Sequence, residues 1–347
     1  MEMDYHAITS THADQRKKRL AWIDYAKCFS IILVISYHIP QHPEEYWGNI
    51  LQLLRMPAFF MIAGYLFKIE KFPSLSYFIK HRSIQLLVPY TFFFIIFYVL
   101  WLTFGREIAQ GEDMEVPLWY PLFEFVYGTP YLVVAPYWFI CCLFSIQIIY
   151  FLLMKYLPKP LAITIILLCP LLHSILGIYN LPWNLALATL YLPFYAFSNL
   201  CKDFISRLSV RQLPLVVSCL MIALIGIYYF NYFSGMAKDI LTIIYGILIL
   251  PTYILLIKGI ACIKTSQTIE RIGKNTIVIL ALQNYIIGAF KILLPHAINN
   301  GGYAINLIFT LLIIALCYIP IMFINKYTPF LIGRGTYFEK KLKIKQP

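Results

Sequence analysis

The sequence predicts an all-α, polytopic integral membrane protein with about ten transmembrane helices. Hydrophobic residues make up 61% of its 347 residues and charged residues only 13%. A soluble domain averages about 45–50% apolar and about 25% charged residues. Aromatic side chains are abundant, with 27 Tyr and 26 Phe, as is typical of helices that meet lipid and its interfaces. The net charge of +12 does not indicate nucleic-acid binding, because the Lys and Arg residues lie in short connections between apolar segments.

A helix needs about 20 mostly apolar residues to cross a membrane, and ten segments approach that length. They cover residues 22–40, 50–67, 84–104, 137–156, 161–178, 183–200, 213–232, 239–257, 275–294 and 304–325. The first follows a basic tail, as a signal peptide would. However, it has the full length of a span and no small-residue cleavage site after it. The sequence therefore predicts a retained first helix.

The distribution of basic residues predicts the orientation of these spans. With the N-terminus inside, most of the 28 Lys and Arg residues fall in the inner connections and the two tails, whereas the outer connections receive only Arg106, Lys238 and Lys291. This asymmetry follows the positive-inside rule. We therefore expect both termini in the cytoplasm, with basic tails at 1–21 and 327–347 around a membrane domain at 22–326. The polar, aromatic segment 105–136 is predicted to be an outer cap or a re-entrant piece.

The eight cysteines lie within or at the ends of apolar stretches. None of them forms a Cys-x-x-Cys pair or a Cys/His cluster with the spacing of zinc ligands. The sequence predicts neither a disulfide framework nor a metal site.

The first helix carries three charged or titratable residues, Asp24, Lys27 and His38. Charges at the centre of a span cost about 2.5–3.5 kcal/mol each on insertion scales, so they usually face a protein interior or a wet cavity. Lys27 and His38 are about three helical turns apart, and Asp24 precedes Lys27 at the i, i+3 spacing. The three residues therefore share one face. Alternatively, Asp24 and Lys27 reach the cytoplasmic interface, His38 bonds a neighbouring helix near the outer end, and Arg55 anchors the outer interface.

Five short motifs follow one another at the predicted spans. They are Asp24-x-x-Lys27 with His38, Met56-Pro57-Ala58-Phe59-Phe60 with Ala63-Gly64-Tyr65-Leu66, Arg82-x-x-Gln85 with Pro89-Tyr90, Trp138-Phe139-Ile140, and "IGKNTIVILALQ" at 272–283. In this order they resemble the acyltransferase-3 family of membrane acyltransferases, which O-acylate sugars of bacterial surface polysaccharides. The resemblance covers essentially the whole chain and is closest to the fucose-4-O-acetylase-like or exopolysaccharide-modifying branch.

The chain departs from the family pattern at four positions. Gln85 replaces a second Arg, Thr276 stands where Ser is usual, Gln283 stands where a late His is usual, and Leu143 occupies a position that is Glu in another branch. The change at Gln85 weakens a basic donor-binding motif. The change at Gln283 puts in doubt any role that needs a second histidine.

The resemblance implies acetyl-CoA or another acyl-CoA as donor, no metal, and a hydroxyl of a surface polysaccharide or lipid-linked oligosaccharide as acceptor. His38 is the predicted base or acyl acceptor, because imidazole titrates near neutral pH. The predicted donor-binding residues are Lys27, Lys80, Arg82 and Gln85, because basic side chains suit phosphate. Asp24 would fix Lys27, Arg55 would stabilise the oxyanion or a sugar hydroxyl, and Trp138 and Gln283 would give substrate or structural support.

Two other classes fit the spans. A transporter or flippase of glycan-lipid or acyl groups would also bury charges in a bundle, but it predicts inverted repeats and broken helices that the sequence does not show. A structural membrane protein explains the spans but not the alignment of Asp24, Lys27 and His38. We expect a multi-pass enzyme of the bacterial cytoplasmic (inner) membrane, in contact with membrane lipid.

Overall fold

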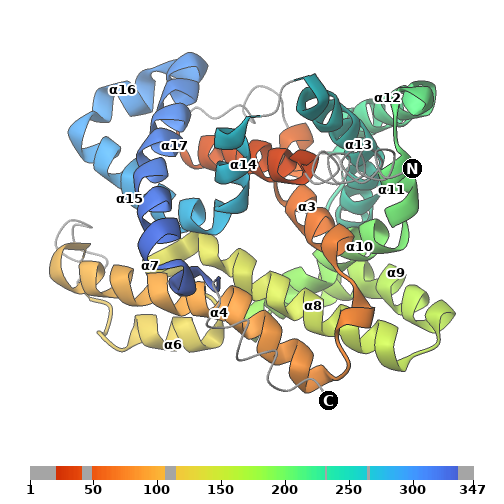
Figure 1. The fold of residues 1–347 in the computed structure, drawn as a ribbon, viewed down its shortest axis with the longest axis horizontal. Coiled ribbons are helices and arrows are strands. Elements are labelled where there is room, and N and C mark those ends of the chain that lie inside the picture. Colours follow the sequence, from red (N-terminus) through yellow and green to blue (C-terminus); the bar gives the residue numbers. More distant parts are fainter. Residues whose placement is uncertain (1–20, 41–48, 106–114, 231–232, 264–265, 335–347) are drawn as a thin grey trace, which may run out of the picture. The chain divides into compact units, whose positions relative to one another are not determined.

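Each of the ten apolar segments that were predicted to cross the membrane forms a helix in the computed structural model of the protein (Figure 1). The structure describes residues 21–40, 49–105, 115–230, 233–263 and 266–334, and these contain no strand. Within this part of the chain, 6 helices are long and apolar enough to cross a membrane. The protein is therefore an all-helical, multi-pass membrane protein. The count of ten crossings and the cytoplasmic position of both termini stay predictions, and most of the two tails lies outside the described residues.

The chain forms two units, and each is described by itself. Unit 1 comprises residues 1–66, 197–276 and 296–311, and unit 2 comprises residues 67–196, 277–295 and 312–347. The main helices of unit 1 are the first helix (residues 21–38), α3 (Asn49–Leu66), α11 (Lys202–Arg207), α12 (Leu213–Phe230), α13 (Gly235–Ile263), α14 (Gln267–Lys274), most of α16 (Pro295–Asn300) and the start of α17 (Gly302–Tyr327). Unit 2 contains α4 (Leu75–Leu100), α6 (Tyr120–Tyr127), α7 (Tyr131–Val134), α8 (Trp138–Tyr156), α9 (Lys159–Leu176), most of α10 (Leu185–Leu200), α15 (Thr276–Leu293) and the rest of α17.

The core of unit 1 forms where α3, α12 and α13 pack together. Leu53, Ala223 and Ile249, one from each helix, are buried against one another. The two helices α12 and α13 lie side by side (Figure 1), and Gly226 lies where they approach closely. A Cβ at Gly226 would overlap the ring of Tyr245. The absent side chain thus allows the close helix contact that small residues provide in membranes, where van der Waals packing drives association.

The first helix lies inside the protein. Of its residues, only Tyr37 is exposed. The hydroxyl of Tyr253, on α13, donates a hydrogen bond to the carbonyl oxygen of Ala26 at 2.6 Å and lies 3.0 Å from Ser30 Oγ. Because a buried hydroxyl is costly without a partner, these bonds fix the position of the helix against α13.

The core of unit 2 is rich in aromatic side chains. Phe78 of α4 stacks on Phe151 of α8, with ring centroids 4.5 Å apart, and Phe97 of α4 stacks on Tyr285 of α15 at 4.0 Å. Tyr285 also donates to the carbonyl oxygen of Val133 at 2.7 Å. Each aromatic pair of this kind contributes about 0.5–1.5 kcal/mol beyond the burial of its apolar area. These pairs therefore stabilise the packing of α4 against α8 and α15.

The helix α4 begins earlier than the sequence predicted. The predicted span starts at residue 84, but Ser74 caps a helix that starts at Leu75, and its Oγ accepts a hydrogen bond from the amide of Tyr77 at 3.2 Å. A Ser cap of this kind stabilises a helix start by about 1 kcal/mol. Lys80 and Arg82, which precede the predicted span, therefore lie on α4.

The chain after α17 returns to α4. The short 3-10 helix Pro329–Ile332 ends at Gly333, whose φ of 70° favours glycine. A Cβ at Gly333 would overlap the carbonyl oxygen of Ile84 and crowd the Cα of Gln85. Gly333 thus lets the chain pack closely against the first turns of α4.

The predicted cap or re-entrant segment 105–136 forms two short helices, α6 and α7, in its described part. Its residues 106–114 lie outside the described residues. Gly128, with a φ of 85°, ends α6, and the chain turns there into α7. The side of the membrane on which this segment lies stays a prediction.

Candidate functional site

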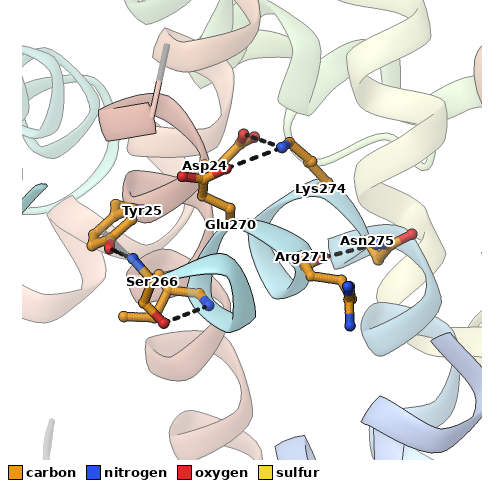
Figure 2. A network of polar contacts seen from close by, with 8 residues as sticks. Asp24, Tyr25, Ser266, Glu270, Arg271, Lys274 and Asn275 are labelled. Atoms are coloured by element: carbon orange, nitrogen blue, oxygen red, sulfur yellow. Dashed lines mark hydrogen bonds and ion pairs between the residues drawn. The ribbon is translucent and has the colours of Figure 1, made fainter. Parts of the chain in front are cut away.

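The start of the first helix is held by α14, an amphipathic helix of unit 1 (Figure 2). The Asp24 carboxylate lies 3.6 Å from the Lys274 ammonium, which also pairs with Glu270 at 3.3 Å. At the other end of α14, the backbone amide of Ser266 donates to the hydroxyl of Tyr25. Two consecutive residues of the first helix therefore contact opposite ends of α14.

The close contact with α14 depends on Gly273. This residue is buried, and a Cβ added to it would overlap the carbonyl oxygen of Asp24. The overlap would be with backbone atoms, which cannot move away as a flexible side chain can. A glycine at this position therefore lets the backbone of α14 meet the backbone of the first helix, which brings Lys274 within reach of Asp24.

The structure changes the predicted surroundings of Asp24. The sequence pairs it with Lys27, and Lys27 does act on it electrostatically. The ion pair seen here, however, is with Lys274, which the sequence reasoning did not single out as a site residue. Its one local signal was the i, i+4 spacing of Glu270 and Lys274 after the capping Ser266. That Asp24 fixes Lys27 stays a prediction.

His38 lies in a small cluster at the other end of the first helix. Its ring is edge-on to the ring of Tyr37, with centroids 5.5 Å apart. The guanidinium of Arg55, from α3, lies 3.6 Å from the centre of the Tyr37 ring, and Arg55 is only 9% exposed. A cation over an aromatic face at this distance is attracted by the ring. Tyr37 thus contacts both Arg55 and His38, two residues that the sequence predicted to lie near the same outer level of the membrane.

The face shared by Asp24, Lys27 and His38 continues through the middle of the helix. Ile31 is two turns from both Asp24 and His38 and is 0% exposed, as is Ile35. Asp24, Lys27 and His38 are themselves half-buried. This face of the first helix therefore contacts protein along its length.

Arg82 and Gln85 form a pair on the first turns of α4 in unit 2. Arg82 Nη1 donates to Gln85 Oε1 at 2.8 Å. Gln85 stands where the family has a second Arg, and here it supplies an acceptor that fixes the direction of the first. The structure thus brings together the two members of the predicted motif.

The described surroundings of Arg82 are aromatic. Its guanidinium carbon lies 5.2, 5.7 and 5.8 Å from the ring centres of Phe72, Phe78 and Phe67. Its Nε is buried without a hydrogen-bond partner, and among the described residues no carboxylate pairs with it. A cation in apolar surroundings is costly unless it is paired, so Arg82 has unused capacity for an anionic group.

The other three predicted residues of unit 2 lie on α4, α8 and α15. Lys80 is exposed on α4. Trp138 begins α8, where its ring lies 6.4 Å from that of Tyr191. Gln283, on α15, is 0% exposed, and neither Nε2 nor Oε1 has a hydrogen-bond partner in the described part of the chain. No contact seen here joins Lys80, Trp138 or Gln283 to Arg82.

Sequence reasoning missed a polar corner in unit 2. Trp183 and Asn184 have φ values of 55° and 52°, which non-glycine residues rarely adopt. The Asn184 amide donates to the carbonyl oxygen of Gly128 at 2.8 Å, and its oxygen accepts from Tyr131 at 3.1 Å. Nearby in sequence, the buried Glu124 accepts from the amide of Leu132 at 3.1 Å. The signal available was the break at Asn180–Pro182.

Two units therefore carry the predicted residues: Asp24, Lys27, His38 and Arg55 lie in unit 1, and Lys80, Arg82, Gln85, Trp138 and Gln283 lie in unit 2. How one set faces the other stays a prediction. Across the residues that the structure describes, no group of three or more His, Cys, Asp and Glu side chains could hold a metal ion.

Arg55 is buried beside Tyr37, the neighbour of His38, and Arg82 is half-buried among aromatic rings. An all-helical membrane protein with such sites fits the broad class of multi-pass transporters and membrane enzymes. Comparison with protein families narrows this class. A family model described as an acyltransferase domain matches residues 20–324. The chain therefore belongs to the acyltransferase-3 family and is a membrane acyltransferase. Searches of curated proteins and of solved structures gave no match.

Proposed function

We propose that this acyltransferase is an O-acetyltransferase that moves an acetyl group from cytoplasmic acetyl-CoA to a hydroxyl of a surface or lipid-linked glycan, in the cytoplasmic membrane of a bacterium. The observation that carries this proposal is the state of Arg82. It is a half-buried cation whose guanidinium is oriented by Gln85, with a buried Nε and no carboxylate partner among the described residues. Such a group suits the phosphates of an acyl-CoA, because a guanidinium forms strong charge-assisted bonds with phosphate oxygens.

The remaining donor contacts follow from the family motif. Lys80 lies on the same helix as Arg82 and is exposed, so it can approach a phosphate from solvent. Gln85 holds Arg82 through its side-chain oxygen and leaves the other guanidinium hydrogens for the ligand. Lys27 is half-buried on the first helix and would contact the donor further along its length.

His38 would act as the general base. Its imidazole would take the proton from the acceptor hydroxyl while that oxygen forms a bond to the acetyl carbon. The tetrahedral intermediate would then collapse, the carbon–sulfur bond would break, and the imidazolium would return its proton to the CoA thiolate. The products are the glycan ester and free CoA, and His38 ends as it began.

Arg55 would stabilise the oxyanion of this intermediate. It is almost fully buried and is held against Tyr37, the neighbour of His38. A fixed positive charge in a site of low dielectric stabilises developing negative charge more than it would in water. Trp138 and Gln283 would support the substrate, because an aromatic face and an amide both suit carbohydrate.

Complementation of a deletion strain tests the role of His38. Surface glycans would be analysed by mass spectrometry, and thioester loss would be followed with a thiol reagent in purified protein. We expect His38→Ala to lower transfer by about 10²–10⁴-fold, the usual contribution of a general base. His173→Ala, at a half-buried histidine of α9, should leave transfer unchanged. Full acetylation of the glycan by the His38→Ala variant would show that His38 is not the general base.

Kinetics with varied acetyl-CoA tests the role of Arg82. Loss of a charge-assisted hydrogen bond costs about 1.5–3 kcal/mol, so Arg82→Gln should raise KM for acetyl-CoA by roughly tenfold or more. Lys155→Gln, at the end of α8, is the matched control and should not change KM. Movement of glycan across the membrane without any thioester turnover would instead support a transporter.

A further inference from the structure

We infer that Asn306 is a positioning residue that fixes the end of the first helix and thereby aims His38. This inference rests on the proposed function, since it concerns the group assigned there as base. Asn306 lies near the start of α17, in the part of that helix that belongs to unit 1. It is 1% exposed. An amide buried in a membrane protein has a cost unless every polar atom finds a partner.

The end of the first helix leaves carbonyl groups without partners. The helix ends at residue 38, and Pro40 explains why, because the residue before a proline is driven out of the helical region. The last carbonyls of any helix lack intrahelical donors. Here the Ile39 amide donates to the Ser36 carbonyl at 3.3 Å, and the helix end is partly buried, with Tyr37 exposed and His38 and Pro40 half-buried. The remaining acceptor capacity is met by side chains or by water.

Asn306 meets this need on both sides of His38 in the chain. Its Nδ2 lies 3.0 Å from the carbonyl oxygen of Ser36, 3.2 Å from that of Ile39 and 3.2 Å from that of Pro40. The nitrogen has two hydrogens, so the three carbonyls share them. His38 lies between the bonded residues, and its backbone is therefore held at both ends by one side chain.

The amide of Asn306 is itself fixed in direction. Its Oδ1 accepts a hydrogen bond from Ser36 Oγ at 2.6 Å and lies 3.5 Å from Thr310 Oγ1. Thr310 also donates to the backbone oxygen of Asn306 at 2.9 Å. Ser36 and Thr310 are buried as well. Because Oδ1 accepts from the Ser36 hydroxyl, the nitrogen faces the carbonyls, and one amide supplies an acceptor and two donor hydrogens at the same point.

The first helix has a second set of polar contacts that provides a matched control. The Tyr253 hydroxyl bonds the carbonyl oxygen of Ala26 and contacts Ser30. These bonds also join the first helix to another helix of unit 1, but about two turns or more away from His38. Tyr253→Phe removes them with little change of shape. A general loss of helix packing would follow from either substitution, whereas misdirection of His38 would follow only from changes at Asn306.

The test measures kcat and KM for acetyl-CoA in purified protein. We expect Asn306→Leu to lower kcat by at least tenfold, since a misplacement of about 1 Å can cost about 100-fold, and to leave KM within about twofold. Asn306→Ser keeps one donor and should recover part of kcat. Tyr253→Phe should leave kcat within about twofold. The inference is overturned if Tyr253→Phe lowers kcat as much as Asn306→Leu, or if Asn306→Leu leaves kcat unchanged.

A double variant separates this inference from the proposed function. If Asn306 acts through His38, then Asn306→Leu should not lower the residual rate of His38→Ala any further. Additive losses would show that Asn306 acts elsewhere and would overturn the inference alone. Wild-type transfer by His38→Ala would instead remove His38 as the base, and the inference would fall with it. Asn306→Ser serves for the same comparison if Asn306→Leu does not fold.

Discussion

The Arg82 guanidinium donates a hydrogen bond to Gln85 Oε1 over 2.8 Å, one turn along α4. The two side chains sit where the family usually places two arginines, so a neutral acceptor here replaces a second positive charge. The motif therefore retains one positive charge, and the hydrogen bond to Gln85 fixes the orientation of the Arg82 guanidinium. This arrangement gives the donor-binding proposal its most direct test.

Changing Gln85 should alter donor binding through Arg82. A neutral hydrogen bond is worth about 0.5–1.5 kcal/mol, so Gln85→Ala should raise KM for acetyl-CoA by about twofold to tenfold. Gln85→Glu should raise it further, because a carboxylate at this position would pair with Arg82 and compete with phosphate. Steady-state kinetics would measure both. Ser83→Ala on the same helix is the control, and an equal rise in its KM would contradict the prediction.

Gly273→Ala should push α14 away from the first helix. The new Cβ would overlap the carbonyl oxygen of Asp24, and overpacking of this kind typically costs about 1–3 kcal/mol. Gly259 on α13 is the matched control, because a Cβ there meets no atom within 4 Å. Gly259→Ala should be neutral or stabilising, since alanine is the better helix former. Unfolding in detergent would compare the two; equal stability of both variants would contradict the close contact.

Gln283→Leu should stabilise the protein. The amide is 0% exposed and its polar atoms have no hydrogen-bond partner in the described part of the chain, and an unsatisfied buried group costs about 1–3 kcal/mol. We expect a rise of about 1 kcal/mol in the free energy of unfolding together with lower transfer, if substrate uses the amide. Ser145→Ala, which breaks a 2.9 Å bond to the carbonyl oxygen of Trp183, should destabilise. A loss of stability in Gln283→Leu would show that the amide is satisfied.

Glu124 should make stability depend on pH. Burial raises the pKa of this carboxyl group, and the hydrogen bond from Leu132 opposes that rise only in part. The folded state therefore holds the proton more tightly than the unfolded chain. The resulting stability is complete below the unfolded pKa, about 4.3, and is lost as the pH rises through the folded pKa. Glu124→Gln should flatten this decline above the unfolded pKa, measured by thermal unfolding. Glu115→Gln, at an exposed position, should not.

The hydropathy of short segments predicted the helices well. The differences between the predicted and the observed helix bounds have local causes. All ten predicted segments are helical, because length and apolar content are properties of a short stretch. The start of α4 was missed because the turns that follow the capping Ser74 carry Lys80 and Arg82. A hydropathy argument counts such residues as a connection, although their capping signal favours a helix.

The sequence did not predict the contacts between residues that lie far apart along the chain. The Asp24–Lys274 pair and the bonds of Asn306 to residues 36–40 join segments that lie far apart along the chain. A single sequence contains no signal for such pairings. Asn306 and Thr310 did offer one hint, since two polar residues at i, i+4 spacing in an apolar span usually have partners. Arg82 and Gln85, by contrast, were grouped by their sequence motif, and their hydrogen bond joins residues three apart on one helix.

The glycine that ends the short helix after α17 has a practical consequence for protein engineering. Gly333 packs on Ile84 and Gln85, so the tail of the membrane domain is part of the support of the turn that carries Arg82. A fusion partner joined upstream of Gly333 would remove this contact. A bulkier residue at position 333 would disrupt it. Tags and reporters are best attached beyond it, through a linker.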